Sequence, residues 1–432
     1  MAPDISQPPA SSSSASSAAV TAESAPAHGA AAASATAAAA VAPPPRRAVL
    51  ANYPPPPPQG LAVDEPVTDS EDEEDHPNRR AAATAASASA AASTSAGPSS
   101  HAAEAPPLAV DSVDSDDEDT EDLLANYASD EEEIDLTHLR LRASGLKSLR
   151  LERFAKTLKH LSLRANLLRK LPASSHFELM TELANLDLYD NELEKVPDVI
   201  KKLEKLESLD LSFNNIRHVS NVSHLSRCHT LYFVQNKIGR IREDDFQGPI
   251  AECLKSLELG GNRIRALEHI EHLTKLEELW VGKNKITKLE NIGSLSSLRI
   301  LSIQSNRITK LENLSELTGL EELYIAHNGL TRIGDGLQAN KNLKVLDVSG
   351  NMIEEIDGVS HLSNLVEFWA NDNKIASFNT LDKHFAPSLM PKLETLYLEG
   401  NPAQRADGPN YRRKVMLACP QIKQIDATFV KA

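Results

Sequence analysis

The chain has 432 residues, a net charge of −16 and an aromatic content of only 4%. Its three cysteines form no C-x-x-C pair, which argues against a zinc site or a disulfide framework and favours a reducing compartment. The N-terminus lacks a basic segment followed by an apolar one, and no apolar run reaches membrane-spanning length. We therefore expect neither a secretory signal nor a membrane span.

The first part of the chain, residues 1–122, is of low complexity. It consists mainly of alanine, serine and proline, interrupted by the acidic blocks "TDSEDEED" (68–75) and "DSVDSDDEDTED" (111–122). Such a composition buries too little apolar surface to offset the chain entropy that folding costs. We therefore expect a long disordered tail.

The negative charge is concentrated in the same part of the chain. Residues 1–135 carry 24 acidic and 4 basic side chains, whereas residues 136–432 carry 37 acidic and 41 basic ones. Ser70, Ser115 and Ser129 each precede acidic residues and are candidate sites for an acid-directed kinase. A purely solvating acidic tail is the simpler interpretation of these blocks.

A repeated unit, L-x-x-L-x-L-x-x-N-x-L/I-x-x-L/I, begins at about residue 136. It is clear in "LESLDLSFNNIRHV" (206–219) and "LEELWVGKNKITKL" (276–289). Most repeats of its asparagine are 22 or 23 residues apart, at positions 166, 191, 214, 236, 262, 284, 306, 328, 351, 373 and 401. A further unit, "LTHLRLRASGLKSL" (136–149), has Ser144 in the asparagine position and brings the count to twelve. This pattern is the leucine-rich-repeat signature.

The spacing of the unit predicts the fold. The two leucines of L-x-L point to the same side of a short strand, and stacked strands bury a continuous leucine core. The asparagine lies where the chain leaves the strand and can satisfy backbone groups there. We predict an α/β solenoid of about twelve 22-residue units, with a parallel sheet on its concave face and short 3₁₀ or irregular segments on its convex face.

Both ends of such an array need a cap. We expect the N-terminal end to begin at "EIDLTHLRL" (133–141). At the other end, "GPNYRRKVMLACP" (408–420) predicts a short amphipathic helix that covers the last coil with Tyr411, Val415 and either Met416 or Leu417. The expected domains are a disordered tail, a solenoid with its N-terminal cap, and a C-terminal cap, at residues 1–122, 123–401 and 402–432.

The residue between the two strand leucines should point out of the concave face. In the twelve units this concave row consists of Arg140, Ser162, Asp187, Asp210, Tyr232, Glu258, Trp280, Ser302, Tyr324, Asp347, Trp369 and Tyr397. Five of the twelve are aromatic, in a chain with 4% aromatic residues, and four are acidic. Strand propensity alone explains some aromatic residues here. The inclusion of both tryptophans, with interleaved acids, favours a protein-binding surface for a basic partner, and Glu278, Glu322 and Glu367 lie beside the row.

Other motifs point away from catalysis and cofactors. "EHIEH" (268–272) falls on a convex segment where such residues are normally solvated, so we predict no metal site there. His327 has no evident nucleophile beside it. Neither a phosphate-binding glycine motif nor a nucleophile-elbow motif occurs, so we expect no enzyme activity and no cofactor. The acidic concave row would repel phosphates, which argues against nucleic acid as a partner.

Several stretches resemble one family, the leucine-rich-repeat regulatory subunits of type-1 serine/threonine protein phosphatase (regulatory subunit 7). The most specific are "EFWANDN" (367–373) and "YRRKVMLACPQIKQIDATFV" (411–430). Further resemblance lies in "LDLSFN" (209–214), "LELGGNRIRALE" (257–268) and "GKNKITKLENI" (282–292). The resemblance covers the repeats and the C-terminal cap but not the tail.

The resemblance implies a non-catalytic subunit that grips the phosphatase catalytic subunit with its concave face, without a homo-oligomer. It implies a location in the nucleus and also the cytoplasm, and roles in mitosis and chromosome segregation. The contacts that it implies are Asp210, Tyr232, Glu258, Trp280, Asp347, Glu367, Trp369 and Tyr397. Periodicity alone adds Tyr324 to this set.

Two features depart from the family pattern or leave an alternative open. Tyr232 stands where the family commonly has phenylalanine, and the longer unit at 236–262 could shift Asp210 relative to Tyr232. The chain lacks a short R/K-V-x-F docking motif, which agrees with docking through the solenoid face. The alternative is a leucine-rich adaptor of another nuclear assembly, for example a spliceosomal one, although the twelve units weigh against it.

Overall fold

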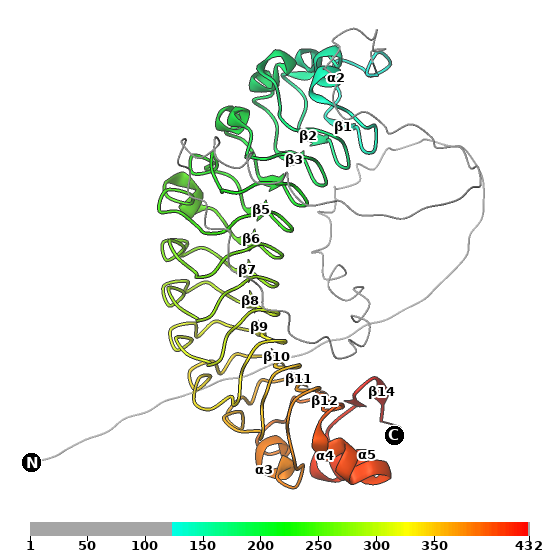
Figure 1. Ribbon diagram of the computed structural model, residues 1–432, viewed down its shortest axis with the longest axis vertical. Coiled ribbons are helices and arrows are strands. Elements are labelled where there is room, and N and C mark those ends of the chain that lie inside the picture. Colours follow the sequence, from blue (N-terminus) through cyan, green and yellow to red (C-terminus); the bar gives the residue numbers. More distant parts are fainter. Residues whose placement is uncertain (1–122, 431–432) are drawn as a thin grey trace, which may run out of the picture. The chain divides into compact units, whose positions relative to one another are not determined.

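The computed structural model describes residues 123–430, so the predicted tail lies outside the described residues. Within them a single sheet of 14 strands follows the chain order. Figure 1 shows the strands on the inner side of a curved array, with turns and short helices on the outer side. The twelve strands that pair in parallel with three residues each are β1 (Glu133–Asp135), β2 (His160–Ser162), β3 (Asn185–Asp187), β4 (Ser208–Asp210), β5 (Thr230–Tyr232), β6 (Ser256–Glu258), β7 (Glu278–Trp280), β8 (Ile300–Ser302), β9 (Glu322–Tyr324), β10 (Val345–Asp347), β11 (Glu367–Trp369) and β12 (Thr395–Tyr397).

The helical segments of the convex side and of the C-terminal cap are all short. The 3₁₀ helices are η1 (Leu151–Phe154), η2 (Ala173–Ser175), η3 (Phe177–Leu179), η4 (Asp198–Lys202), η5 (Pro249–Glu252) and η6 (Gly408–Asn410). The α-helices are α2 (Ala143–Ser148), α3 (Leu381–Phe385), α4 (Pro402–Asp407) and α5 (Tyr411–Ala418). The solenoid fold predicted from the repeat spacing is confirmed.

The core runs the length of the array because each coil contributes the same positions to it. Leu279 and Val281, on either side of Trp280, are both fully buried. Phe368 takes the place of a strand leucine in its coil and is also fully buried. Burial of a side chain of this size contributes roughly 1.5–3 kcal/mol to the stability of the fold. The stacked coils therefore hold the sheet, and the side chains that project from its concave face, in one arrangement.

The predicted asparagines form a continuous ladder along the edge of the sheet. In the coil of Asn284, the side-chain nitrogen donates to the carbonyls of Leu259 and Val281, at 3.0 Å each, and the side-chain oxygen accepts from the backbone N–H of Ile264 at 3.0 Å. The same pattern joins Asn166 to the coil before it. Each amide therefore satisfies turn groups of its own coil and of the preceding coil.

A second set of asparagines, which the sequence analysis did not identify, supports the convex side. Asn221, Asn291 and Asn313 all have left-handed backbone conformations. Their side-chain nitrogens donate to carbonyls of the preceding coil at 2.9, 2.7 and 2.6 Å. Gly358 has the same left-handed conformation, with φ at 64°. A Cβ at residue 358 would lie 1.7 Å from the carbonyl oxygen of Gly334, so this coil requires glycine.

The register of the first coil differs from the prediction. Asp135 in β1, and not Arg140, occupies the row position and pairs with Ser162 of β2. Arg140 lies outside the strand, with φ at 55°, and Ser144 belongs to α2. Leu139 stands in the place of the ladder asparagine and is 45% exposed. The sequence "LRL" imitates the strand pattern, which is why the predicted strand was wrong here.

The C-terminal cap closes the array with a helix and two short strands. β13 (Gln424–Ile425) pairs in parallel with β12, and β14 (Thr428–Phe429) pairs antiparallel to β13. Tyr411 and Val415 of α5 are buried, as predicted. The prediction for Met416 or Leu417 was wrong, because these side chains are 40% and 74% exposed.

A buried carboxylate ties this cap to the last coil. Asp426 accepts the backbone N–H groups of Leu398 and Glu399 at 2.9 and 3.1 Å. It also accepts the hydroxyl of Tyr411 at 3.0 Å. Asp426 therefore satisfies the backbone donors that directly follow β12.

Candidate functional site

The concave row exists as a physical line of side chains from Ser162 onward. Each row residue ends its strand, and adjacent members are direct register partners across the sheet. Asp210 pairs with Tyr232 and Tyr232 with Glu258, so the long unit at 236–262 does not disturb the row. Its extra residues form η5 instead. Further register neighbours are Glu258 with Trp280, Tyr324 with Asp347, Asp347 with Trp369, and Trp369 with Tyr397.

One aromatic pair in the row spans an intervening strand. The rings of Trp280 and Tyr324 lie 6.4 Å apart with 19° between their planes. Ser302, between them in the register, is only 1% exposed. The small serine thus leaves room for two large rings to approach each other over the sheet.

A second aromatic pair lies near the C-terminal end of the row. The rings of Trp369 and Tyr397 are 5.5 Å apart and tilted by 57°. Gln424 of the cap donates to the hydroxyl of Tyr397 at 2.8 Å. The indole nitrogen of Trp369 is buried and has no hydrogen-bond partner within the described residues. A buried donor without an acceptor costs about 1–3 kcal/mol.

A line of glutamates runs parallel to the aromatic residues. Residues two apart in a strand share a face, so Glu278, Glu322 and Glu367 lie on the concave face with the row residues of their strands. The indole nitrogen of Trp280 donates to Glu278 at 3.4 Å, and the hydroxyl of Tyr324 donates to Glu322 at 2.7 Å. These carboxylates orient the rings and also supply negative charge beside them.

The aspartates of the row have a local structural function as well. Asp187, Asp210 and Asp347 each accept the backbone N–H of the residue two positions later, at 2.9, 2.9 and 3.0 Å. Asp210 is only 7% exposed, and burial raises the pKa of Asp347 above its ordinary value. The aspartates therefore fix the turns after their strands and present less free charge than the glutamates.

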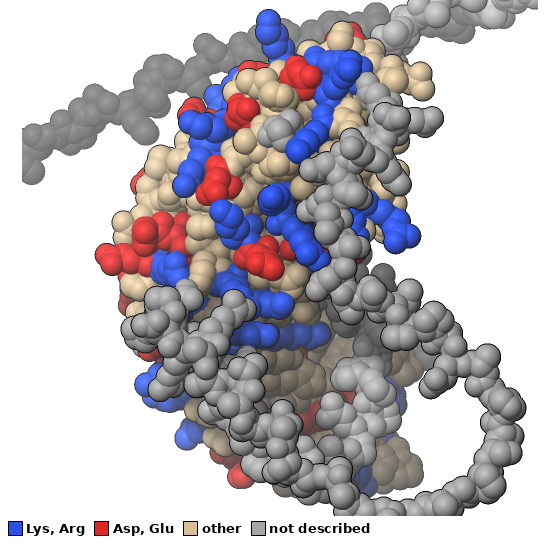
Figure 2. All heavy atoms as spheres, turned by 45° about the horizontal axis from the view of Figure 1, so that its top comes forward, with Lys and Arg blue, Asp and Glu red and all other residues tan. Residues whose placement is uncertain are grey.

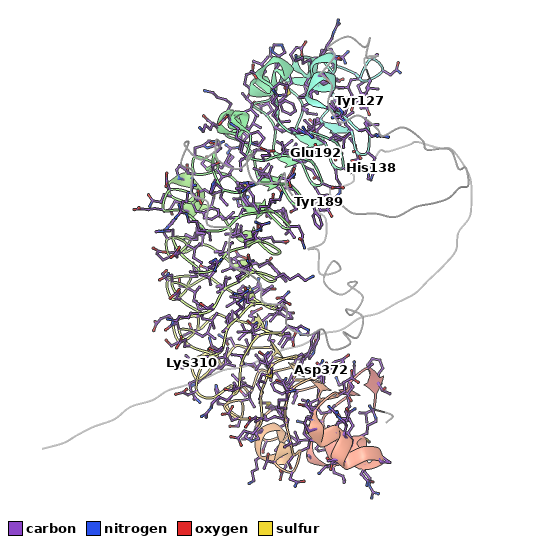
Figure 3. The ribbon with its side chains drawn as sticks, in the orientation of Figure 1. Tyr127, His138, Tyr189, Glu192, Lys310 and Asp372 are labelled. Carbon is purple, nitrogen blue, oxygen red and sulfur yellow. The ribbon has the colours of Figure 1, made fainter. Side chains whose placement is uncertain are left out.

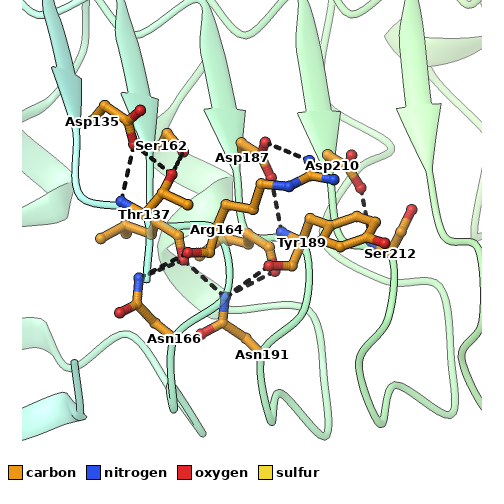
Figure 4. A network of polar contacts seen from close by, with 12 residues as sticks. Asp135, Thr137, Ser162, Arg164, Asn166, Asp187, Tyr189, Asn191, Asp210 and Ser212 are labelled. Carbon is orange, nitrogen blue, oxygen red and sulfur yellow. Dashed lines mark hydrogen bonds and ion pairs between the residues drawn. The ribbon is translucent and has the colours of Figure 1, made fainter. Parts of the chain in front are cut away.

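The structure also brings together a cluster that the row analysis missed. Arg164 lies with its guanidinium 3.6 Å from the ring centre of Tyr189, and it forms an ion pair with Asp187 at 3.1 Å (Figure 4). The ring of Phe213 is 4.7 Å from that of Tyr189. Figure 3 places Tyr189 on the strand-lined side of the array, opposite to Lys310. The sequence carries a signal for this cluster directly after the row residues. In "LDLYDN" (186–191) a tyrosine lies two positions after the row residue, and in "LDLSFN" (209–214) a phenylalanine lies three positions after it.

One hollow of the structure lies apart from the concave row. A hollow of about 570 Å³ is lined by Gln247, Gly248, Pro249, Ala251, Glu252 and His272, and none of these belongs to the row. Within residues 123–430, no group of three or more His, Cys, Asp or Glu is arranged to hold a metal ion. No helix of this part of the chain is long and apolar enough to cross a membrane.

Family models for leucine-rich repeats match three stretches of the chain. The model described as "Leucine-rich repeat" matches residues 160–281. "Leucine Rich repeats (2 copies)" matches residues 296–339, and "Leucine rich repeat" matches residues 318–375. All three stretches lie inside the solenoid.

Several relatives are named as regulatory subunits of protein phosphatase 1. The chain is 42% identical over 152 residues to the protein phosphatase 1 regulatory inhibitor subunit PPP1R7 homolog of Arabidopsis thaliana, covering 34% of this chain and 44% of that protein. It is 44% identical over 117 residues to protein phosphatase 1 regulatory subunit SDS22 of Saccharomyces cerevisiae, covering 27% and 32% of the two. It is 67% identical over 39 residues to protein phosphatase 1 regulatory subunit 7 of Homo sapiens, covering 9% and 10%. The matched segments span less than half the length of these relatives.

Solved structures agree with the fold. A leucine-rich-repeat protein of Leptospira interrogans superimposes with a TM-score of 0.56 at 26% identity, covering 64% of this chain and 68% of that one. An internalin of Listeria monocytogenes superimposes with a TM-score of 0.52 at 21% identity, covering 70% and 87%. These likenesses concern the solenoid architecture alone.

Proposed function

We propose that this chain, whose repeats are homologous to those of protein phosphatase 1 regulatory subunits, binds the type-1 phosphatase catalytic subunit and regulates it. The relatives are named as regulatory subunits, and the fold is a repeat solenoid rather than an enzyme scaffold. The chain therefore acts as a non-catalytic binding protein. Its concave row is the proposed contact surface.

The observation that carries this proposal is the presence of two aromatic pairs on one rigid sheet. Trp280 pairs with Tyr324, and Trp369 pairs with Tyr397. Large aromatic side chains at the centre of an interface supply most of its binding energy because they lose extensive apolar surface to the partner. Rigid strands keep these rings ordered before binding, so little side-chain entropy is lost on association.

The charge of the row indicates what lies opposite. Glu258 belongs to the row, and the glutamates at 278, 322 and 367 lie beside it. Asp210 and Asp347 complete the proposed contact set together with Tyr232. Carboxylates arranged around aromatic anchors favour a partner surface with Lys or Arg side chains, and they exclude partners that carry like charge.

Cellular roles form part of the same proposal. We place the protein in the nucleus and the cytoplasm, with a role in mitosis and chromosome segregation. The support is the resemblance to the regulatory-subunit family. Imaging of a fluorescent fusion through the cell cycle, and scoring of segregation errors after depletion, would test both parts.

The binding test uses the full chain and the purified catalytic subunit. Trp280→Ala and Trp369→Ala together should raise the Kd roughly 30-fold or more, since a central anchor contributes about 2 kcal/mol or more. Isothermal titration calorimetry would measure the change. Leu179→Ala is the control, because Leu179 is a large side chain that is 45% exposed and lies in η3, away from the row.

An unchanged affinity in the double variant, with its circular dichroism spectrum intact, would rule out the proposed contact surface. Untargeted affinity purification of the full chain gives an independent measurement. Recovery of another nuclear assembly without the phosphatase would favour the adaptor alternative.

A further inference from the structure

The sheet continues beyond the concave row, because the C-terminal cap adds two strands to it. β13 pairs in parallel with β12, and β14 pairs antiparallel to β13. Figure 1 shows β14 at the end of the sheet, beyond β12. Residues that are direct register partners in a sheet project from the same face. The strand register therefore shows which side chains of the cap share the concave face with the row.

The register places Gln424 and Phe429 on the concave face. Thr395 of β12 pairs with Gln424, and Gln424 pairs with Phe429. The side-chain nitrogen of Gln424 donates to the hydroxyl of Tyr397 at 2.8 Å, so Gln424 lies on the same side of the sheet as this row residue. Phe429, as the partner of Gln424, projects to that side as well. Two strand spacings separate it from β12, which corresponds to about 10 Å.

The residue after Phe429 supports this orientation. Val430 packs against the hydrophobic core. Its N–H donates to the carbonyl of Lys423 at 2.8 Å, which continues the antiparallel pairing. Successive side chains of a strand point to opposite faces. Since Val430 faces the core, Phe429 faces away from the core on the concave side.

Phe429 is the most exposed Phe, Tyr or Trp side chain within residues 123–430, at 73%. Tyr127 and Phe213 follow at 37% each. Charged side chains are common elsewhere on the surface, and Figure 2 shows Lys and Arg side chains spread over the N-terminal coils, which it turns forward. A single exposed ring needs no explanation by itself. This ring, however, lies on the same face as the two aromatic pairs of the concave row.

The hairpin that carries Phe429 is fixed by hydrogen bonds to both of its strands. The guanidinium of Arg412 in α5 donates to the carbonyl of Ile425 at 2.9 Å and to that of Thr428 at 3.2 Å. Asp426, in the turn between the strands, accepts two backbone N–H groups of the last coil. The ring is therefore held on an ordered strand, and little backbone entropy is lost when a partner covers it.

We propose that Phe429 is a further anchor for the type-1 phosphatase catalytic subunit, so that the contact surface continues from the concave row onto the cap. This inference rests on the proposed function. Phe429 lies three strand spacings, or about 14 Å, from Trp369 on the same face. An interface of standard size buries about 800 Å² on each partner and is wider than this distance. The catalytic subunit that covers Trp369 and Tyr397 therefore extends over Phe429 and meets it with an apolar patch.

Measurement of affinity with a matched control in the cap tests the proposal. Phe429→Ala in the full chain should raise the Kd for the purified catalytic subunit about tenfold. Leu417→Ala is the control, because Leu417 is 74% exposed in the same cap but belongs to α5 and not to the sheet. Both side chains are exposed, so both variants should unfold at the same temperature as the parent. An equal loss of affinity in the two variants would contradict a specific contact at Phe429.

The double variant Trp280→Ala and Trp369→Ala separates a failure of this inference from a failure of the proposed function. If the double variant weakens binding and Phe429→Ala does not, the contact surface ends at the concave row and Phe429 is not an anchor. The proposed function would then stand. If none of these variants weakens binding, the proposed contact surface is wrong, and the proposed contact at Phe429 is wrong with it.

Photo-cross-linking detects the contact itself. With Phe429→p-benzoylphenylalanine, irradiation of the complex should join the chain covalently to the catalytic subunit, whereas Leu417→p-benzoylphenylalanine should not. A covalent link requires that the two surfaces touch, so an indirect effect of residue 429 on the concave row would not produce it. Capture of a second copy of this chain in place of the catalytic subunit, or no capture at all, would overturn the proposal.

Discussion

The indole of Trp280 and the phenol ring of Tyr324 lie 6.4 Å apart, although the strand that carries Ser302 separates them. A large side chain at position 302 would fill the space between the two rings. Ser302 is 1% exposed, so the pair closes over it. The concave surface is therefore a set of ordered ring pairs rather than a row of independent side chains.

The first prediction concerns this pair. Tyr324→Ala should weaken phosphatase binding and change the near-ultraviolet circular dichroism of Trp280, because the indole loses the ring that orders it. Tyr324→Phe is the matched control, since it keeps the ring and removes the hydroxyl that donates to Glu322. Equal affinities for the alanine and phenylalanine variants would show that the ring pair does not contribute to binding.

The second prediction concerns the asparagine ladder. Asn284→Ala should lower the free energy of unfolding by roughly 2–3 kcal/mol, because it leaves buried backbone groups of two coils without partners. Urea denaturation followed by circular dichroism measures the loss. Asn342→Ala is the control, because Asn342 makes a single exposed bond to Thr318 at 2.9 Å. A loss no larger than that of the control would refute a structural role for the ladder.

The third prediction concerns Gly358. Gly358→Ala should destabilise the protein by at least about 1–2 kcal/mol from the left-handed backbone alone, and further because the new Cβ would collide with the Gly334 carbonyl. Gly293→Ala is the control, since the nearest atom to its added Cβ is 3.7 Å away and its φ is ordinary. Thermal unfolding of the two variants should separate them by several degrees. Overlapping transitions would mean that the coil adapts.

The fourth prediction concerns pH. Burial raises the pKa of Asp245 from 3.8 to about 6, so the folded state holds this proton more tightly than the unfolded state. The stabilisation that protonation provides is complete below pH 3.8 and is lost as the pH rises through about 6. Asp245→Asn keeps an acceptor for the Arg242 backbone N–H, which donates to the carboxylate at 2.8 Å.

The stability of the parent is therefore compared with that of the Asp245→Asn variant at two pH values. The variant should be more stable relative to the parent at pH 7.5 than at pH 5, because only the parent buries a charge at the higher pH. Urea midpoints at both values measure this difference. A stability difference that is independent of pH would show that Asp245 does not titrate in this range.

Much of the fold could be predicted from the sequence because two repeating signals, the L-x-L alternation and the recurring asparagine, agree with each other. The alternation of L-x-L specifies which side of each strand is buried, and the recurring asparagine places each turn. Together they assigned the register of every strand from β2 to β12 and the line of row residues on the concave face. They failed at the first coil, where Leu139 replaces the asparagine and the true strand lies earlier.

The details of the site were less accessible from the sequence. The pairing of Trp280 with Tyr324 depends on side-chain rotamers and on the small size of Ser302. The cluster of Arg164, Tyr189 and Phe213 lies outside the row, at positions where the repeat has no fixed residue type. The turn-forming bonds of the row aspartates arise from backbone geometry after the strand. None of these relationships has a periodic signal.

The stacked coils also fix the distances between side chains on the concave face. Trp280 in β7 and Trp369 in β11 are four coils apart, which corresponds to about 19 Å along the sheet. Inserting or removing one coil between them would change this separation in a fixed step of about 5 Å, whatever residues the coil contained. The number of repeats between Trp280 and Trp369 therefore determines the spacing that a partner surface must match. It matters as much as the identity of the two side chains.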